Sequence, residues 1–289
     1  MTDHKNADGL SRRQFVQLSG VVGAAAVLGG GVAGVAAGKH AFAARILPAR
    51  PRTDLCGNPS DTGDRFVLWE KAQDCADALK KKKPNPPGCM GTTDDYVVLN
   101  GKSHSDHDFL LVPTRRVMGI ECPYIWSNTA PNYWKAAWDE AQRGGASPVR
   151  GGTIGLGINS KQDRDQDQLH IHMAQILSGV QKQLEDAKHI TTDPRKWKYA
   201  IVSVVGLESG RQDARYYRVL RVKDLQQNLF ALLQDNVAGT SDMAIQTMIV
   251  TERDARGGGF YVLNSDPTLT GPTRGQGGTG TCDSLLKYD

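Results

Sequence analysis

The 289-residue sequence lacks the features of several common site types. It has five cysteines but no Cys-x-x-Cys pair, so the spacing typical of a structural zinc site is absent. Its net charge is only +4, and part of that charge lies in the N-terminal region and in the lysine run 80–83, which does not indicate nucleic-acid binding. The glycines of 23–34 follow no strand, which excludes a dinucleotide-binding fingerprint there. With 39% hydrophobic and 23% charged residues, the composition is ordinary for a globular protein.

The first 44 residues have the pattern of an export signal. Arg12 and Arg13 precede a weakly apolar stretch, 19–38, which is followed by an A-x-A cleavage pattern at 41–43. These features predict a twin-arginine signal, recognised by export machinery for folded proteins and cleaved near Ala43 or Ala44. The apolar stretch is about long enough to span a bilayer, so a membrane anchor is the alternative. In both cases we expect the domain in the periplasm or on the outer face of a bacterial inner membrane.

Two histidines, His170 and His172, stand two residues apart in an apolar run, 166–173, that is typical of a β-strand. Successive side chains on a strand point to opposite faces, so both rings and Gln168 are predicted to share one face. A polar loop, 158–167, precedes the run, and loops held by a rigid element are where ligand contacts concentrate. These three polar side chains on one face predict either a nucleophile with the residues that orient it or part of a metal site. The alternative is that the histidines are solvated on an edge strand.

A second segment, 108–116, is a short apolar strand that ends at Pro113 and is followed by Arg115. Together with Asn159, the polar loop and the histidine strand, it resembles the histidine-triad superfamily. Further elements follow one another over most of 66–265: Leu68-Trp69, the Cys75 and Cys89 pair, Tyr96-Val97-Val98-Leu99, Leu110-Leu111-Val112-Pro113-Thr114, Gly119-Ile120-Glu121, Pro131-Asn132-Tyr133-Trp134, Ile158-Asn159-Ser160, and Gln166 through His172. In this order they resemble more closely the CDP-diacylglycerol pyrophosphatase family, also called CDP-diacylglycerol phosphatidylhydrolase, which is placed among the triad-like folds.

The fold class predicted from the elements is α+β, because strands and helices are mixed without strict alternation. Periodicity predicts helices over 66–79, 133–142, 176–188 and 224–233, strands over 96–99, 109–112, 154–158, 199–205 and 216–222, and a closing hairpin from 243–250 and 259–263. The resemblance implies a histidine-triad-like antiparallel sheet with packed helices as a single domain, 66–265. Composition predicts a linker over 45–65 and a flexible tail over 266–289.

The resemblance also implies an activity, the hydrolysis of CDP-diacylglycerol to CMP and phosphatidate through a histidine nucleophile, without a cofactor. A neutral imidazole near its ordinary pKa of about 6.5 attacks phosphorus and gives a nucleotidyl-histidine that water cleaves. We expect His170 to be the nucleophile, although placing His172 at the middle of the triad pattern leaves Ala174 third and keeps the register open. The expected donors to the phosphates are Asn159, Gln166, Gln168 and His172, with Arg164 or Arg115. A membrane surface is the expected partner, and the lysine run 80–83 is either solvated or in contact with anionic headgroups.

Two other functions remain open at this point. A metal-dependent phosphoester hydrolase would use His170 and His172 with Asp163, Asp165 or Asp167 as ligands. A non-catalytic exported protein that binds nucleotides or lipids is the alternative from a different class.

The cysteines agree with an oxidising compartment. The family resemblance includes the Cys75 and Cys89 pair, and a bond between them closes the short loop that carries the lysine run. A second bond is expected between Cys282 and either Cys122 or Cys56, which would pin the tail and leave one thiol over.

Overall fold

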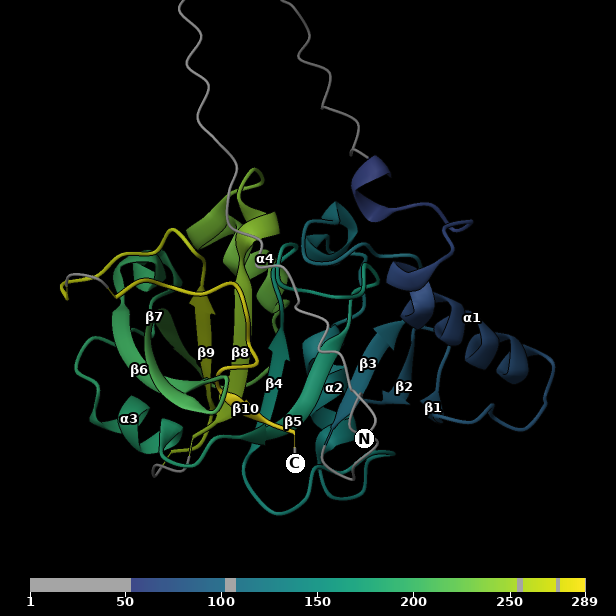
Figure 1. Cartoon of the computed structure of the whole chain (residues 1–289), viewed down its shortest axis with the longest axis horizontal. Coiled ribbons are helices and arrows are strands. Elements are labelled where there is room, and N and C mark those ends of the chain that lie inside the picture. The colour runs from purple at the N-terminus through teal and green to yellow at the C-terminus, as the bar shows by residue number, and fades with distance from the viewer. Residues whose placement is uncertain (1–52, 102–107, 254–256, 274–275, 289) are drawn as a thin grey trace, which may run out of the picture. The chain divides into compact units, whose positions relative to one another are not determined.

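A large antiparallel sheet is the framework of the chain, as a computed structural model shows over the residues that it describes, 53–101, 108–253, 257–273 and 276–288 (Figure 1). The strand order is β1-β2-β3-β5-β4-β8-β9-β7-β6, with β10 paired to β5, and every pair of strands is antiparallel. The strands are β1 (Cys89–Thr92), β2 (Tyr96–Asn100), β3 (Phe109–Pro113), β4 (Ile154–Ile158), β5 (Ile171–Ile176), β6 (Ile201–Glu208), β7 (Arg211–Val222), β8 (Thr247–Glu252), β9 (Phe260–Ser265) and β10 (Leu286–Lys287). The α+β class is confirmed, whereas the histidine-triad-like placement stays a prediction.

Among the described residues, four α-helices flank the sheet: α1 (Val67–Lys80), α2 (Tyr133–Ala141), α3 (Val180–Asp186) and α4 (Leu229–Leu233). The first two match the predicted helices closely. The third begins later than predicted, because β5 continues to Ile176 and Gly179 then caps the helix in a left-handed conformation. Short 3-10 helices cover Thr53–Cys56, Asp64–Phe66, Pro123–Trp126, Pro194–Tyr199 and Met243–Ile245, and a π-helix covers Gln234–Ala238. Within the described residues, no helix is long and apolar enough to cross a membrane.

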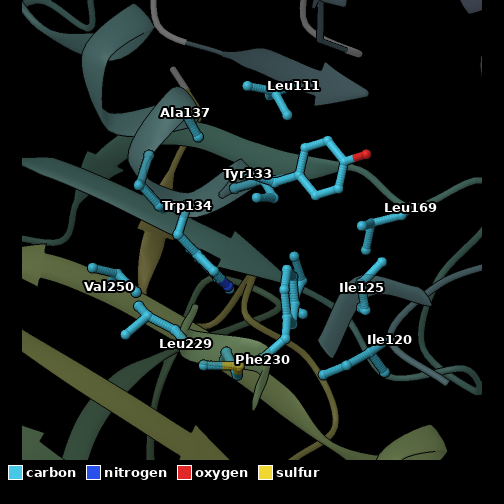
Figure 2. Close-up of a cluster of buried hydrophobic side chains, with 14 of the residues drawn as sticks. Leu111, Ile120, Ile125, Tyr133, Trp134, Ala137, Leu169, Leu229, Phe230 and Val250 are labelled. Atoms are coloured by element: carbon cyan, nitrogen blue, oxygen red, sulfur yellow. The ribbon is translucent and has the colours of Figure 1, made fainter. Parts of the chain in front are cut away.

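Successive side chains of β3 point to opposite faces of the sheet and join two different hydrophobic clusters. Phe109 and Leu111 point into the larger cluster, where Trp134 of α2 packs on Phe230 with ring centroids 5.4 Å apart (Figure 2). Leu110 and Val112 point to the other face and pack with α1 and β2. His172 is paired directly with Leu110, so its side chain belongs to the face that α1 covers.

The histidine strand is shorter than predicted, since β5 begins at Ile171 and the backbone of Gln168 forms only an isolated bridge with Met118. The hairpin of β8 and β9 is confirmed, but it lies in the middle of the sheet and does not close it. Strand order depends on long-range pairing, which a local pattern does not contain.

The segments predicted as linker and tail make tertiary contacts where the structure describes them. Residues 53–65 are tied to the domain by the disulfide of Cys56 with Cys122 and by a hydrogen bond of 3.1 Å from the Trp69 indole to the Pro59 carbonyl. The C-terminal residues include β10, and Cys282 and Leu285 are buried. Apolar residues beyond the glycine-rich stretch supply the burial that a flexible tail would lack.

The Cys75–Cys89 bond is confirmed, whereas the second bond differs from the prediction. Cys122 pairs with Cys56, and Cys282 is a free, buried thiol. Cys122 lies in the hydrophobic cluster that contains α2, whereas Cys282 lies in the separate cluster that contains Leu286 of β10. The two sulfurs are therefore not neighbours.

Candidate active site

A pocket of about 840 Å³ lies on the α1 face of the sheet, where β3, β4 and β5 meet. Its lining comes from five parts of the chain: α1 (Val67, Leu68, Lys71), the loop before β1 (Pro87, Gly88), β2 and β3 with the residues beside them (Leu99, Asn100, Gly101, Asp108, Leu110), the segment from β4 to β5 (Asn159, Asp163, Asp165, Gln166, His170, His172) and the C-terminal segment (Asp283, Tyr288). Such a concave site with convergent polar groups is the usual form of a small-molecule site.

The ring of His170 is held by one hydrogen bond to the main chain. Its Nδ1 lies 2.8 Å from the Gln168 carbonyl oxygen, which only accepts hydrogen bonds, so Nδ1 carries the proton and Nε2 keeps a lone pair. The residue is 8% exposed. Burial, reinforced by the charge of His172, lowers the pKa of His170 to about 3. The ring is therefore neutral at physiological pH, as a nucleophile must be.

The ring of His172 lies beside that of His170, with centroids 5.0 Å apart. Both of its nitrogens are shielded from solvent, and neither has a hydrogen-bond partner among the described residues. Buried polar atoms are normally paired, so an unpaired imidazole at a pocket wall is available to a ligand.

Gln168 lies outside the pocket, although we predicted it on the histidine face. Its side-chain oxygen accepts from Arg116 at 2.9 Å and from the Val117 amide at 3.1 Å, while its nitrogen donates to the carbonyls of Pro113 and Arg115. The amide is fully buried and its bonds are used in bracing the segment after β3. It is the backbone carbonyl of Gln168, not the side chain, that orients His170.

The two predicted arginine donors also lie outside the lining. Arg164 is 4% exposed and makes two hydrogen bonds of 2.7 Å to Glu121, so its fork is already occupied by a carboxylate. Gly119 permits this packing: its φ is +62°, and a Cβ there would lie 1.9 Å from Arg164 Nη1. Arg115 is exposed and its guanidinium lies 4.2 Å from the ring centroid of Tyr124.

Asn159 and Gln166 do line the pocket, but their side chains hold other segments. The Asn159 oxygen accepts from the Cys282 amide at 2.7 Å, and its nitrogen donates to Asp283 at 3.3 Å. Gln166 accepts from the Leu68 amide at 3.1 Å and donates to the Asp64 carbonyl at 2.7 Å, which caps the start of α1. Both residues position pocket walls.

Sequence reasoning missed Lys71, Asp108, Asp283 and Tyr288. Lys71 is an exposed residue of a helix that was predicted correctly. Its spacing of four residues from Val67 places both on the same side of that helix, and this spacing could have indicated that Lys71 faces the pocket. Asp283 and Tyr288 lie in the segment interpreted as a tail, where no local pattern indicated a site.

One cluster of metal-ligating type occurs within the described part of the chain: ligand atoms of His172, Cys282 and Asp283 lie within 4.8 Å of one another. The metal set that we predicted, with Asp163, Asp165 or Asp167, does not form this cluster. Asp167 instead makes ion pairs with Arg65 at 2.9 Å and with Arg164 at 3.3 Å. Burial, followed by the charge of Asp283, raises the pKa of the Cys282 thiol, which keeps it protonated at neutral pH.

Comparison with known proteins adds an independent finding. The family model of CDP-diacylglycerol pyrophosphatase matches residues 63–281, and that of the twin-arginine translocation pathway signal sequence matches residues 9–29. The chain is 33% identical over 183 residues to the CDP-diacylglycerol pyrophosphatase of Yersinia pestis, an alignment that covers 61% of this chain and 67% of that protein. The family match includes both histidines and ends two residues before Asp283.

Proposed function

The chain belongs to the CDP-diacylglycerol pyrophosphatase family, and from that premise we propose that it hydrolyses CDP-diacylglycerol to CMP and phosphatidate with His170 as the nucleophile. The observation that carries the proposal is the hydrogen bond from His170 Nδ1 to the Gln168 carbonyl at 2.8 Å. It leaves Nε2 unprotonated in a neutral ring at the wall of a pocket large enough for a nucleotide.

In the first step, Nε2 of His170 attacks the phosphorus next to cytidine, and the bond from that phosphorus to the bridging oxygen breaks. Phosphatidate leaves, and His172 protonates the leaving oxygen. The ring of His170 gains a positive charge, which its Nδ1–H shares with the Gln168 carbonyl. In the second step, water attacks the nucleotidyl phosphorus, the P–N bond breaks, and the proton of the water passes to His172.

The charges of the pocket suggest how the substrate lies. Lys71 is the one lysine or arginine among the described lining residues, and it stands on the first turns of α1. A cation at this place attracts the diphosphate. The carboxylates of Asp108, Asp163 and Asp165 line the pocket too, and carboxylates accept hydrogen bonds from hydroxyl and amino groups such as those of cytidine.

The experiment that tests the proposal combines turnover with trapping of the intermediate. We expect His170→Ala to abolish the release of CMP from CDP-diacylglycerol, and His172→Ala to leave a small residual activity. Rapid quenching of the wild-type enzyme with cytidine-labelled substrate should give an acid-labile label on His170. Label on His172 would move the register by two residues, and full activity in both variants would contradict the histidine mechanism. Absence of turnover with every nucleotide lipid would favour a binding protein.

A metal-dependent hydrolase is the second candidate, because His172, Cys282 and Asp283 offer nitrogen, sulfur and oxygen atoms within 4.8 Å, a donor set that zinc accepts. Such an ion would act as a Lewis acid toward a phosphate oxygen. Dialysis against EDTA separates the two candidates. Activity that survives supports the metal-free mechanism, whereas activity that is lost and then restored by zinc or manganese supports the metal.

The membrane surface is the proposed location of the substrate. The exposed lysines 80–83 connect α1 to the loop whose Pro87 and Gly88 line the pocket, and the Cys75–Cys89 bond holds this connection to β1. Each lysine near an anionic surface contributes about 1 kcal/mol of attraction. We expect replacement of all four by glutamine to reduce sedimentation with anionic vesicles, while Lys196→Gln/Lys198→Gln does not.

The twin-arginine match over 9–29 supports export across the inner membrane. We propose that the signal is removed near Ala43 or Ala44 and that the domain acts in the periplasm, at the outer face of that membrane. Residues 1–52 lie outside the described residues, so the structure does not test the cleavage site.

A further inference from the structure

The C-terminal segment forms one wall of the pocket and brings a carboxylate close to His172. Strand β10 adds to β5 through the pairs of Leu286 with Ile176 and Lys287 with Gln175, and β5 is the strand that carries His172. Asp283 and Tyr288, on either side of this pairing, both line the pocket. The segment is therefore held to the same strand as the histidine that it approaches.

The carboxylate of Asp283 is anchored by three protein donors. The Tyr288 hydroxyl donates to Oδ1 at 2.5 Å, the Asn159 amide donates to Oδ2 at 3.3 Å, and the Cys282 thiol lies 3.7 Å from Oδ1. A carboxylate whose oxygens accept from protein groups has a fixed orientation.

Gly157 makes the close approach of the segment possible. It is paired with His172 across β4 and β5, and a Cβ there would lie 2.7 Å from both the Cβ and the Sγ of Cys282. Any larger residue would push the segment, and Asp283 with it, away from the histidine.

Asp283 and His172 interact electrostatically. Asp283 is an exposed residue whose carboxylate accepts hydrogen bonds from Tyr288 and Asn159, and a carboxylate of this kind is an anion at neutral pH. A ring nitrogen of His172 lies within 4.8 Å of a carboxylate oxygen, a separation that one bridging water or a small rotation closes.

We propose that Asp283 is the positioning residue for His172 in the water-attack step, an inference that rests on the proposed function. In that step the water oxygen bonds to the nucleotidyl phosphorus, the bond from phosphorus to His170 Nε2 breaks, and the water proton moves to His172. The ring of His172 becomes positively charged, and the anion of Asp283 stabilises that charge and orients the ring.

The two steps depend on His172 to different degrees. The leaving group of the first step is a phosphate, whose second pKa is about 6, so it departs with little help from an acid. The nucleophile of the second step is water, which is a far weaker acid than a phosphate, so it needs a base to take its proton. Loss of Asp283 therefore slows the hydrolysis of the nucleotidyl-histidine more than its formation.

The test is a burst experiment on the full mature chain with CDP-diacylglycerol labelled in the cytidine. For Asp283→Asn we expect a burst of phosphatidate close to one equivalent of enzyme, followed by turnover that is roughly tenfold to hundredfold slower than in the wild type. The labelled nucleotidyl-enzyme should accumulate during this slow phase. Asp283→Glu, which keeps the charge, should recover part of the rate, and Lys287→Gln, an exposed change in the same C-terminal segment, should behave as the wild type.

Three outcomes would overturn the inference. A burst that is lost together with turnover would mean that Asp283 serves the fold or the first step. A rate for Asp283→Asn equal to that of the wild type would mean that the carboxylate has no part in the reaction. Bound zinc in the wild-type protein that disappears in Asp283→Asn would make the residue a metal ligand. A wild-type enzyme that turns over without any covalent label contradicts the histidine nucleophile itself, which distinguishes failure of the proposed function from failure of this inference.

Discussion

At the scale of single residues, the bond between His170 Nδ1 and the Gln168 carbonyl decides which imidazole nitrogen can react. The same site illustrates how a pattern can identify the right residues and the wrong atoms. Alternation along a strand predicted that the Gln168 side chain stands beside the histidines, but that side chain is bonded to Arg116 and to the chain after β3. A buried side-chain amide can make four hydrogen bonds, and it adopts the position in which all four are made.

The neutral state of His170 leads to a prediction on stability at low pH. The folded-state pKa of about 3 lies below the unfolded value of about 6.5, so the unfolded chain takes up one proton more than the folded chain between these values. The contribution of His170 to stability is therefore complete above about pH 6.5, and it falls by about 1.4 kcal/mol per pH unit as the pH decreases toward 3. His170→Gln lacks this proton uptake.

Urea unfolding of both proteins at pH 7.5, 5.5 and 4.5 measures the difference. We expect the free energy of unfolding of the wild type to fall more steeply with decreasing pH than that of His170→Gln, because the other titrating groups are common to both. A difference between the two proteins that stays constant over this pH range would show that His170 is not held neutral by the fold.

At the scale of secondary-structure elements, the walls of the pocket are held in place by a few cross-links. Gln166 caps α1, Asn159 holds the C-terminal segment, and the Cys75–Cys89 bond joins α1 to β1. Periodicity predicted α1, α2 and most of the strands, because their apolar faces are continuous in sequence. It did not predict where β5 begins or that β10 exists, since a two-residue strand has no period of its own.

The two disulfides lead to a prediction on their relative contributions to stability. They join cysteines 14 and 66 residues apart, and a cross-link that closes a longer loop removes more entropy from the unfolded chain. We expect Cys75→Ser/Cys89→Ser to lower the free energy of unfolding by about 3 kcal/mol and Cys56→Ser/Cys122→Ser by about 4 kcal/mol.

Denaturant titrations under non-reducing conditions measure both values, and the reduced wild type is the control. The first pair also fixes a pocket wall, so its loss should weaken substrate binding more than the chemical step. A larger loss of stability for the shorter loop would contradict the entropic account and assign the effect to strain or packing in the folded state.

At the scale of the whole molecule, the protein combines an export signal with a domain that carries the exposed lysines 80–83 at the end of α1. Export of a folded domain suits a domain that contains two disulfides and whose segment around β10 lies beside the pocket. The substrate proposed for the site is a lipid, which a domain beyond the inner membrane meets at that membrane's outer face.

The export signal is the object of the prediction at this scale. Arg12→Lys/Arg13→Lys should retain the precursor in the cytoplasm, because the paired arginines are the feature by which such a signal is recognised. Cell fractionation measures the retention, and Arg50→Lys/Arg52→Lys, outside the matched segment, is the control. Unchanged export of the first variant would rule out the twin-arginine route, and an intact N-terminus in the membrane fraction would support the anchor.

The export signal, the α+β class, the family, the Cys75–Cys89 bond and the two histidines of the pocket were all predictable from the amino-acid sequence alone. Each of these features depends on contiguous residues or on an ordered set of short motifs. The three-dimensional fold was needed to show that Arg164 pairs with Glu121, that the Gln168 side chain bonds to the segment after β3, and that Asp283 lies near His172. These contacts join residues that are 43 positions apart or more, and burial and pairing of strands bring them together. The periodicity of a single segment does not show which distant side chains come into contact. Those contacts depend on how the sheet and its helices pack against one another.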